Sequence, residues 1–183
     1  MNAYFGKLLV VDLDDESHAI VSLGESLLKT YIGGSGLGAR LLYDCTGGET
    51  DPLSSENVLI FATGPFTGTQ IPSTGRHAVV AKSPLTGIWG ESDVGGRWGM
   101  RLKGSGLDAV MIKGAANRPV TISIEPDRVG IEDAASLWGL DTYALSDTLK
   151  EIHGPHAEIC AIGRAGEHLL PLAALMHDGR HGR

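Results

Sequence analysis

Apolar and polar residues alternate along this chain in a pattern that predicts many short strands and few helices. Two apolar, β-branched runs joined by the polar turn DDES predict an opening hairpin, and a second hairpin is expected across Glu125–Arg128. Other apolar runs bounded by turn residues also predict strands. The expected strands occupy residues 6–13, 18–23, 58–63, 77–82, 88–91, 107–114, the two arms of 119–133, 157–163 and 170–176.

The clearest helix is predicted over residues 142–153, where apolar side chains recur at helical spacing. Asp141 is a suitable N-cap for it, and Gly154-Pro155 is a typical stop signal. Shorter helices are expected over residues 25–32, 37–44 and about 95–103, the last capped by Ser92 or Asp93. Because the helices do not alternate strictly with the strands, the pattern favours an α+β fold.

The stretch from Thr63 to Gly106 is unusually rich in glycine, with ten glycines among 44 residues, against roughly 7% in an average protein. Glycine allows backbone N–H groups to approach a ligand closely. Single cations lie between the glycines, with few residues suited to acid–base or nucleophilic chemistry. The stretch therefore predicts a binding surface for a large phosphorylated cofactor. The cations are Arg76, Lys82, Arg97, Arg101 and Lys103.

Two places in this stretch are candidate anion contacts. Gly95 and Gly96 follow Asp93 at the expected helix start, where free N–H groups and the helix dipole favour phosphate. The same glycines could instead serve close packing, and the Asp93 carboxylate would repel phosphate unless a cation such as Mg²⁺ bridges them. Arg76 precedes a strand and could form a forked contact with a phosphate or a heterocycle, although an exposed turn arginine would look the same.

The segment Gly34–Ala39 matches a relaxed dinucleotide-binding pattern, G-x-G-x-x-A, with acidic Asp51 and Glu56 downstream. That fingerprint requires a preceding strand and a βαβ unit. Here the preceding element is predicted to be helical, so we interpret the segment as a loop between two helices and disfavour a nicotinamide-dependent dehydrogenase.

Composition restricts the class of protein. The 183 residues, 42% hydrophobic and 20% charged, suit a single soluble domain. A net charge of −7 without a basic run argues against nucleic acid as a partner. The sequence contains no apolar stretch of about 18 residues, so no membrane span is predicted. Without a signal-like N-terminus, a cytoplasmic location is expected.

No metal-binding or catalytic set of side chains is predicted in this chain. Cys45 and Cys160 lie far apart in apolar surroundings, which predicts buried free thiols. His177 and His181 could share a metal only on a helix, which Gly179 and Gly182 disfavour, so a polar loop is expected there.

Seven segments occur in an order and spacing that resemble the N-terminal domain of the tungsten-containing aldehyde ferredoxin oxidoreductase family. The resemblance covers essentially all 183 residues, and its most specific part is P-L-S-x-E-N, GP-x-TGT and KSPLTG. The segments are GKLLVVDL, YIGGSGLGARLLYD, DPLSSENVLIFATGPFTGT, GRHAVVAKSPLTG, SDVGG, LKGSGLDAVMIKG and IGRAGE.

The resemblance implies two related β-sheets with a few short helices, forming the base for a tungsten or molybdenum bispterin cofactor with a bridging Mg²⁺. It assigns one pterin contact to Arg76, phosphate contacts to the segment of Asp93, Val94, Gly95 and Gly96, and a further contact to a loop that begins at Arg183. The family often has asparagine where this chain has Asp93, so we assign the phosphate contact there to the backbone N–H groups and not to the Asp93 side chain.

The reaction implied is oxidation of an aldehyde to a carboxylic acid, with electrons leaving through a 4Fe–4S cluster to ferredoxin. The cluster cysteines and the substrate-facing residues of the family lie in later helical domains. We therefore expect residues 1–183 to be the cofactor-base domain and to be inactive alone. Activity would need those C-terminal domains or a partner subunit. A homodimer is also an open alternative. The alternative is a non-redox binding or assembly module that retains the fold.

Overall fold

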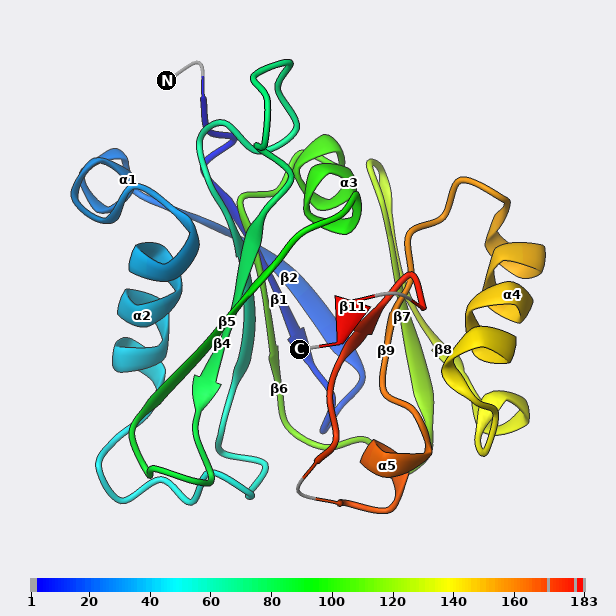
Figure 1. Ribbon diagram of the computed structural model, residues 1–183. Helices are drawn as coiled ribbons and strands as arrows, with labels where there is room; N and C mark the ends of the chain where they lie inside the picture. The colour runs from blue at the N-terminus through cyan, green and yellow to red at the C-terminus, as the bar shows by residue number, and fades with distance from the viewer. Residues whose placement is uncertain (1–2, 171, 180, 183) are drawn as a thin grey trace.

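The computed structural model describes residues 3–170, 172–179 and 181–182 and is built around a six-stranded sheet (Figure 1). The strands follow the order β2-β1-β6-β3-β4-β5 across this sheet. Their bounds are β1 (Lys7–Asp12), β2 (Ser17–Ser22), β3 (Leu59–Thr63), β4 (His77–Lys82), β5 (Trp89–Val94) and β6 (Ala109–Lys113).

The strand β6 lies inside the sheet although it is the last of the six along the chain. It pairs parallel to β1, from Leu8↔Ala109 onward, and antiparallel to β3. All other pairs in the sheet are antiparallel. The sheet is therefore mixed, and β1 and β3 are held apart by β6.

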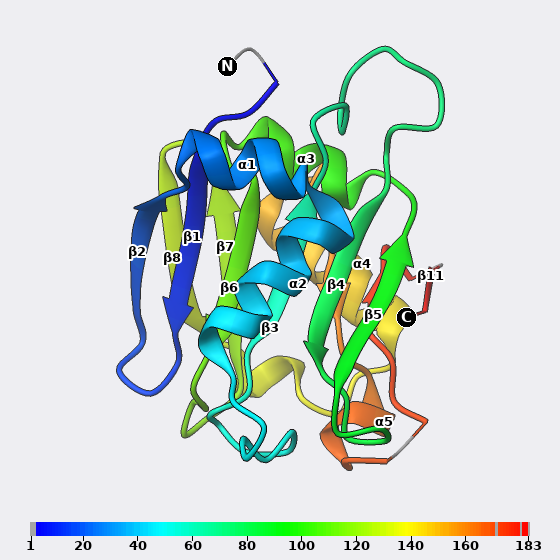
Figure 2. The same ribbon diagram turned by 90° about the vertical axis from the view of Figure 1, so that its left-hand side faces the viewer.

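The helices α1 (Glu25–Tyr31) and α2 (Gly34–Cys45) cover one face of the sheet (Figure 2). Leu37, Leu41 and Leu42 of α2 are buried against apolar residues of β3 and β4. Gly38 allows this contact, because a Cβ atom there would lie 2.7 Å from Cγ2 of Val80. Apolar burial of this kind is the main source of stability in a fold of this size.

The opposite face of the sheet packs on the second half of the chain (Figure 1). The β7–β8 hairpin contributes apolar side chains to a cluster with the first sheet, and α4 packs with its own apolar cluster. A small sheet, β11-β10-β9, completes this half. The elements are α3 (Trp98–Gly104), β7 (Val120–Glu125), β8 (Arg128–Asp133), the 3-10 helix η1 (Ala135–Leu137), α4 (Thr142–His153), β9 (Cys160–Ala161), α5 (Arg164–Glu167), β10 (Met176–His177) and β11 (His181–Gly182).

Most predicted elements are confirmed, and the fold is α+β as expected. Both hairpins form, β4 occupies the predicted residues, and the turn of the second hairpin lies where it was expected. The side chain of Asp141 caps α4 by accepting hydrogen bonds from the backbone N–H groups of Tyr143 and Ala144.

Three local predictions are wrong. The segment Gly34–Ala39 lies in helix α2, and the loop between the helices is limited to Ile32 and Gly33. The predicted strand over 157–163 is reduced to Cys160–Ala161. The strand predicted over 170–176 is absent at residues 172–175, where turn and irregular backbone lead into Met176–His177, and Pro171 lies outside the described residues.

Within the part of the chain that the structure describes, no helix is long and apolar enough to cross a membrane.

Candidate functional site

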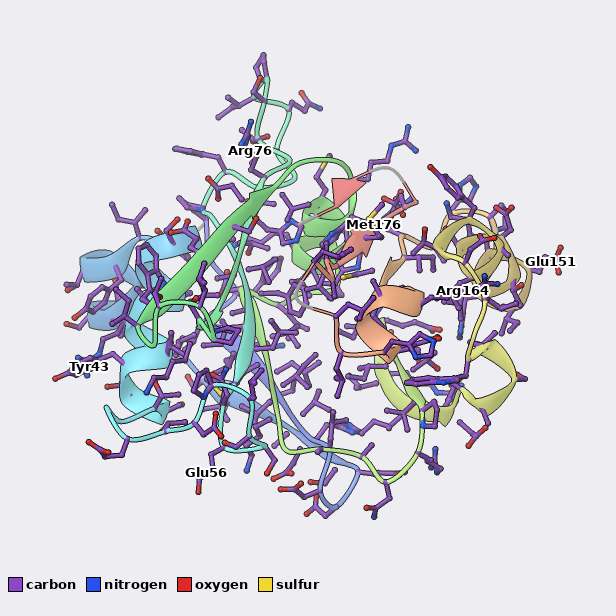
Figure 3. The ribbon with its side chains drawn as sticks, turned by 60° about the horizontal axis from the view of Figure 1, so that its bottom comes forward. Tyr43, Glu56, Arg76, Glu151, Arg164 and Met176 are labelled. Carbon is purple, nitrogen blue, oxygen red and sulfur yellow. The ribbon has the colours of Figure 1, made fainter. Side chains whose placement is uncertain are left out.

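Three of the predicted cofactor contacts line one pocket of about 450 Å³. Arg76 comes from the end of the loop between β3 and β4, and Gly95 and Gly96 follow β5. Figure 3 shows Arg76 close to this projecting loop, well away from Glu151 on α4. The remaining lining residues are Thr69, Ile71, Ser73, Thr74, Gly75 and Met100.

Strand pairing explains why these residues meet. β4 and β5 are antiparallel, and His77, the first residue of β4, is paired with Val94, the last residue of β5. Arg76 precedes the pair on one strand and Gly95 follows it on the other, so the two leave the sheet side by side. The buried Thr67 hydroxyl then fastens the loop, because it accepts from the N–H of Gly64 at 2.9 Å and donates to the carbonyl of Arg76 at 3.2 Å.

Three of the nine lining residues are glycines, so part of the pocket wall is bare backbone. A Cβ atom on Gly75 would lie 2.6 Å from the carbonyl oxygen of Gly96, so the two segments approach more closely than any larger residue would allow. Gly96 has a φ of 95°, which favours glycine. Gly95 faces open space, since a Cβ atom there would meet no atom within 4 Å. The geometry suits a ligand recognised by peptide groups and one guanidinium.

A cluster of closely packed aromatic rings lies next to the pocket. The His77 ring is 1% exposed and lies 4.9 Å from the Trp98 ring and 5.1 Å from the His177 ring, centroid to centroid. Burial lowers the pKa of His77 to about 3, with a smaller effect from His177, so the His77 ring is neutral at pH 7. Close packing of Gly99 on His77 holds α3 in place, and α3 carries Met100 to the pocket.

The predicted helix start at Ser92–Gly96 is wrong. Asp93 and Val94 belong to β5, paired with Ala78 and His77, and α3 begins at Trp98. Tertiary pairing with β4 has overridden the capping preference of serine and aspartate. No helix-end phosphate site is formed there, because Gly95 and Gly96 lie in the connection before this seven-residue helix.

The remaining predicted contacts differ in exposure. The Val94 side chain is fully buried in the core, so only its backbone could face a ligand. The Asp93 side chain is exposed on β5. Arg183 lies outside the described residues.

Two of the cations singled out from the sequence have structural roles. The Lys82 ammonium is buried and donates to the carbonyl groups of Gly47, Gly48 and Thr50 at 2.7–3.0 Å. The buried Lys103 forms an ion pair with Asp108, whose other carboxylate oxygen accepts from the N–H of Gly6 at 2.6 Å. Arg76 is the cation that lines the pocket.

The cysteines are free, as predicted, but neither is fully buried. Cys45 is exposed, which corrects the expectation for that residue. Cys160 is half-buried, and burial raises the pKa of its thiol to about 12, with a smaller contribution from Asp178. Neither thiol is activated as a nucleophile.

Residues 176–177 and 181–182 pair as two short antiparallel strands where a polar loop was expected. His177 on β10 is paired with His181 on β11. Across the described ranges, no group of three or more His, Cys, Asp or Glu residues could hold a metal ion.

Several lining residues were missed by reasoning from the sequence. The threonines of the β3–β4 loop carry a weak signal, because hydroxyl residues beside glycine often form tight turns. Met100 carries none, because its position at the pocket depends on how α3 packs against His77.

Comparison with known proteins agrees with this architecture. The family profile for the N-terminal domain of aldehyde ferredoxin oxidoreductase matches residues 8–183. A tungsten-containing aldehyde ferredoxin oxidoreductase of Pyrococcus abyssi is 41% identical over 180 residues, covering 98% of this chain and 30% of that protein. The WOR-like subunit of an aliphatic sulfonate oxidoreductase of Pyrococcus furiosus is 39% identical, covering 99% of this chain and 31% of that protein.

A solved structure has the same fold. It is the active-site complex BamBC of benzoyl coenzyme A reductase with 1,5-dienoyl-CoA, which superposes with a TM-score of 0.92 at 35% identity. The match covers 96% of this chain and 27% of that one. The chain thus spans about 30% of the length of the curated relatives that it matches, and it belongs to the aldehyde ferredoxin oxidoreductase family, of which it represents the N-terminal domain.

Proposed function

We propose that the pocket beside Arg76 holds part of a tungsten or molybdenum bispterin cofactor, and that the chain is the base domain of an oxidoreductase that converts aldehydes to carboxylic acids. The observation that carries this proposal is the convergence of Arg76, Gly95 and Gly96 on one pocket. Arg76 lies 19 residues before Gly95, and the antiparallel pairing of β4 with β5 brings the two together at one end of the sheet.

The residues present fit such a group. A pterin phosphate needs charge-assisted hydrogen bonds, and a flat ring system needs an approach free of side chains. Arg76 can donate the charge-assisted hydrogen bonds, and the open space at Gly95 leaves room for the flat ring system. When bound, such a group would supply the two-electron chemistry of aldehyde oxidation, with a 4Fe–4S cluster and a ferredoxin as the electron acceptors on this proposal.

The chain's own residues would position the cofactor. Arg76 would donate a forked pair of hydrogen bonds to phosphate or to a pterin edge. The N–H groups of Gly95 and Gly96 would donate to phosphate oxygens. The exposed Asp93 carboxylate at the end of β5 would face a bridging Mg²⁺, and Arg183 would add a second cation.

Substrate choice would then lie outside this domain. The relatives named above include an aldehyde, a sulfonate and a benzoyl-CoA enzyme. Their resemblance to one chain at 35–41% identity fits a shared base that carries the cofactor while other parts select the substrate. The 4Fe–4S cluster and the ferredoxin contact belong, on this proposal, to those other parts.

The test is the Arg76→Ala substitution in the complete protein that carries this domain, purified without oxygen from a host supplied with tungstate and molybdate. Loss of charged hydrogen bonds worth about 1.5–3 kcal/mol predicts roughly 10- to 150-fold weaker retention. Arg128→Ala on β8, which removes an equal charge far from the pocket, should leave the metal content unchanged. Metal retention by the Arg76 variant equal to that of the control would refute the site and favour the assembly module.

A further inference from the structure

Buried polar side chains gather at one end of the six-stranded sheet, the end at which Arg76 enters β4. Thr63, Thr67, Lys103 and Asp108 are each at most 7% exposed. A buried polar group costs free energy unless it is hydrogen-bonded. These four side chains are satisfied by one another and by nearby backbone groups, in three successive links that lead to Arg76.

The first link joins helix α3 to the sheet. The Lys103 ammonium of α3 forms an ion pair with the Asp108 carboxylate. The other oxygen of that carboxylate accepts from the N–H groups of Gly6 and Lys7, at 2.6 and 3.3 Å. Because α3 also carries Met100, which lines the pocket, the ion pair helps to fix one part of the pocket wall.

The second link joins Asp108 to strand β3. The Asp108 carbonyl accepts from both the backbone N–H and the hydroxyl of Thr63, at 2.9 and 2.8 Å. Thr63 is the last residue of β3 and is paired with His77, the first residue of β4. This link therefore fixes the point at which the β3–β4 loop leaves the sheet.

The third link closes the β3–β4 loop on Arg76. The Thr67 hydroxyl accepts from the N–H of Gly64 at 2.9 Å and donates to the carbonyl of Arg76 at 3.2 Å. A hydroxyl has a single proton to donate, and Thr67 uses it on Arg76. The backbone N–H of Thr67 also donates to the carbonyl of Gly64, at 3.2 Å. One side chain thus connects the two ends of the loop that supplies most of the pocket lining.

The loop also contacts α3 next to Thr67. Gly68 has a φ of 80°, and a Cβ atom there would lie 3.6 Å from the carbonyl oxygen of Met100. The turn at Thr67 and Gly68 therefore lies against the helix and holds the Arg76 carbonyl at the same time. Both Arg76 and Met100 face the pocket from segments that this turn touches.

We propose that Thr67 is a positioning residue whose hydroxyl sets the direction in which Arg76 enters the pocket. The inference rests on the proposed function, because it concerns how the Arg76 guanidinium is presented to an anionic pterin. A forked contact requires a fixed direction of the guanidinium plane. Thr67 holds the backbone of the residue that carries this plane, and it is not among the described residues that line the pocket.

Two valine variants of the complete protein test the proposal. Thr67→Val keeps the shape of the side chain and removes both hydrogen bonds of the hydroxyl. Loss of the neutral hydrogen bond to Arg76 predicts roughly 2- to 10-fold weaker retention of tungsten or molybdenum on dialysis. Thr67→Ser restores the hydroxyl and should recover the retention.

Thr63→Val is the matched control. It removes another buried hydroxyl of the same network, but the backbone N–H of residue 63 still donates to the Asp108 carbonyl. Its metal retention should equal that of the wild type. Equal loss of metal in the two valine variants, or a serine variant as weak as Thr67→Val, would show a general effect on stability and overturn the proposal.

Hydrogen exchange separates this inference from the proposed function. In protein from a host grown without tungstate and molybdate, the amides of residues 64–76 should exchange faster in Thr67→Val than in Thr63→Val. Equal exchange in the two variants would overturn the role of Thr67. Faster exchange in Thr67→Val, together with full metal retention by Arg76→Ala, would support the role of Thr67 and refute the cofactor site.

Discussion

Gly75 and Gly95 line the same pocket, and the same substitution should affect them in opposite ways. The Cβ atom of Gly75→Ala would lie 2.6 Å from the carbonyl oxygen of Gly96, a distance that real Cβ atoms do not adopt. The obstacle is backbone and cannot rotate away. Overpacking of this kind costs about 1–3 kcal/mol, and at about 2–4 °C per kcal/mol the Tm should fall by roughly 2–12 °C.

The Gly95→Ala substitution meets no such obstacle. Its Cβ atom would have no neighbour within 4 Å, and Gly95 is not among the residues with positive φ. Stability should be unchanged or raised by up to about 1 kcal/mol through the unfolded chain. The added methyl group nevertheless occupies space at the pocket, so the tungsten or molybdenum content should fall while the fold persists.

Thermal unfolding and elemental analysis of the complete protein separate these effects. Gly48→Ala is the matched control, because a Cβ atom there also meets nothing within 4 Å and the residue is distant from the pocket lining. The expected order of Tm is Gly75→Ala below the other two, and the expected loss of metal affects both pocket variants. A Gly75 variant with wild-type Tm, or a Gly95 variant with full metal content, would refute the reasoning.

Two further predictions concern buried charge. Because the pKa of His77 is lowered to about 3, the unfolded chain binds a proton that the folded chain excludes, and stability should fall by up to about 1.4 kcal/mol per pH unit from pH 6.5 downward. His77→Phe should flatten the pH dependence of urea unfolding, and parallel curves would show that His77 titrates normally. Lys103→Met should cost about 3–5 kcal/mol because it leaves the buried Asp108 carboxylate without its ion-pair partner. Lys113→Met, at a partly exposed pair, should change the urea midpoint little, and equal shifts would contradict this.

The predicted elements that hold are those with strong local signals. The helix over 142–153 has a capping aspartate and a regular apolar face, and the hairpins have apolar runs on each side of a turn. Arg76 could be proposed from its place beside a glycine-rich turn. These features need no knowledge of distant residues.

The parts that failed depend on tertiary contacts. Trp89–Val94 has few apolar residues and forms a strand because β4 offers it an edge. The glycines of α2 suggest a loop, yet Gly38 is required in the helix by the proximity of Val80. The apolar run before Met176 resembles a strand, but its described residues 172–175 pair with no other strand. The pocket itself arises from the β4–β5 register, which composition does not encode.

The central place of β6 affects how the protein is made. β1 leaves the ribosome almost 100 residues before β6, its inner neighbour. At a translation rate of about 5–20 residues per second, one edge of the β1–β2 hairpin stays unpaired for roughly 5–20 seconds. During that interval Leu9 and Val11 have neither β6 nor β7 to cover them. Synthesis of this domain therefore includes a period of exposure to chaperones and to misplaced strands. The open edge of β1 can be paired only after Lys113 has emerged, and the apolar face of β1 can be covered only after β7 follows.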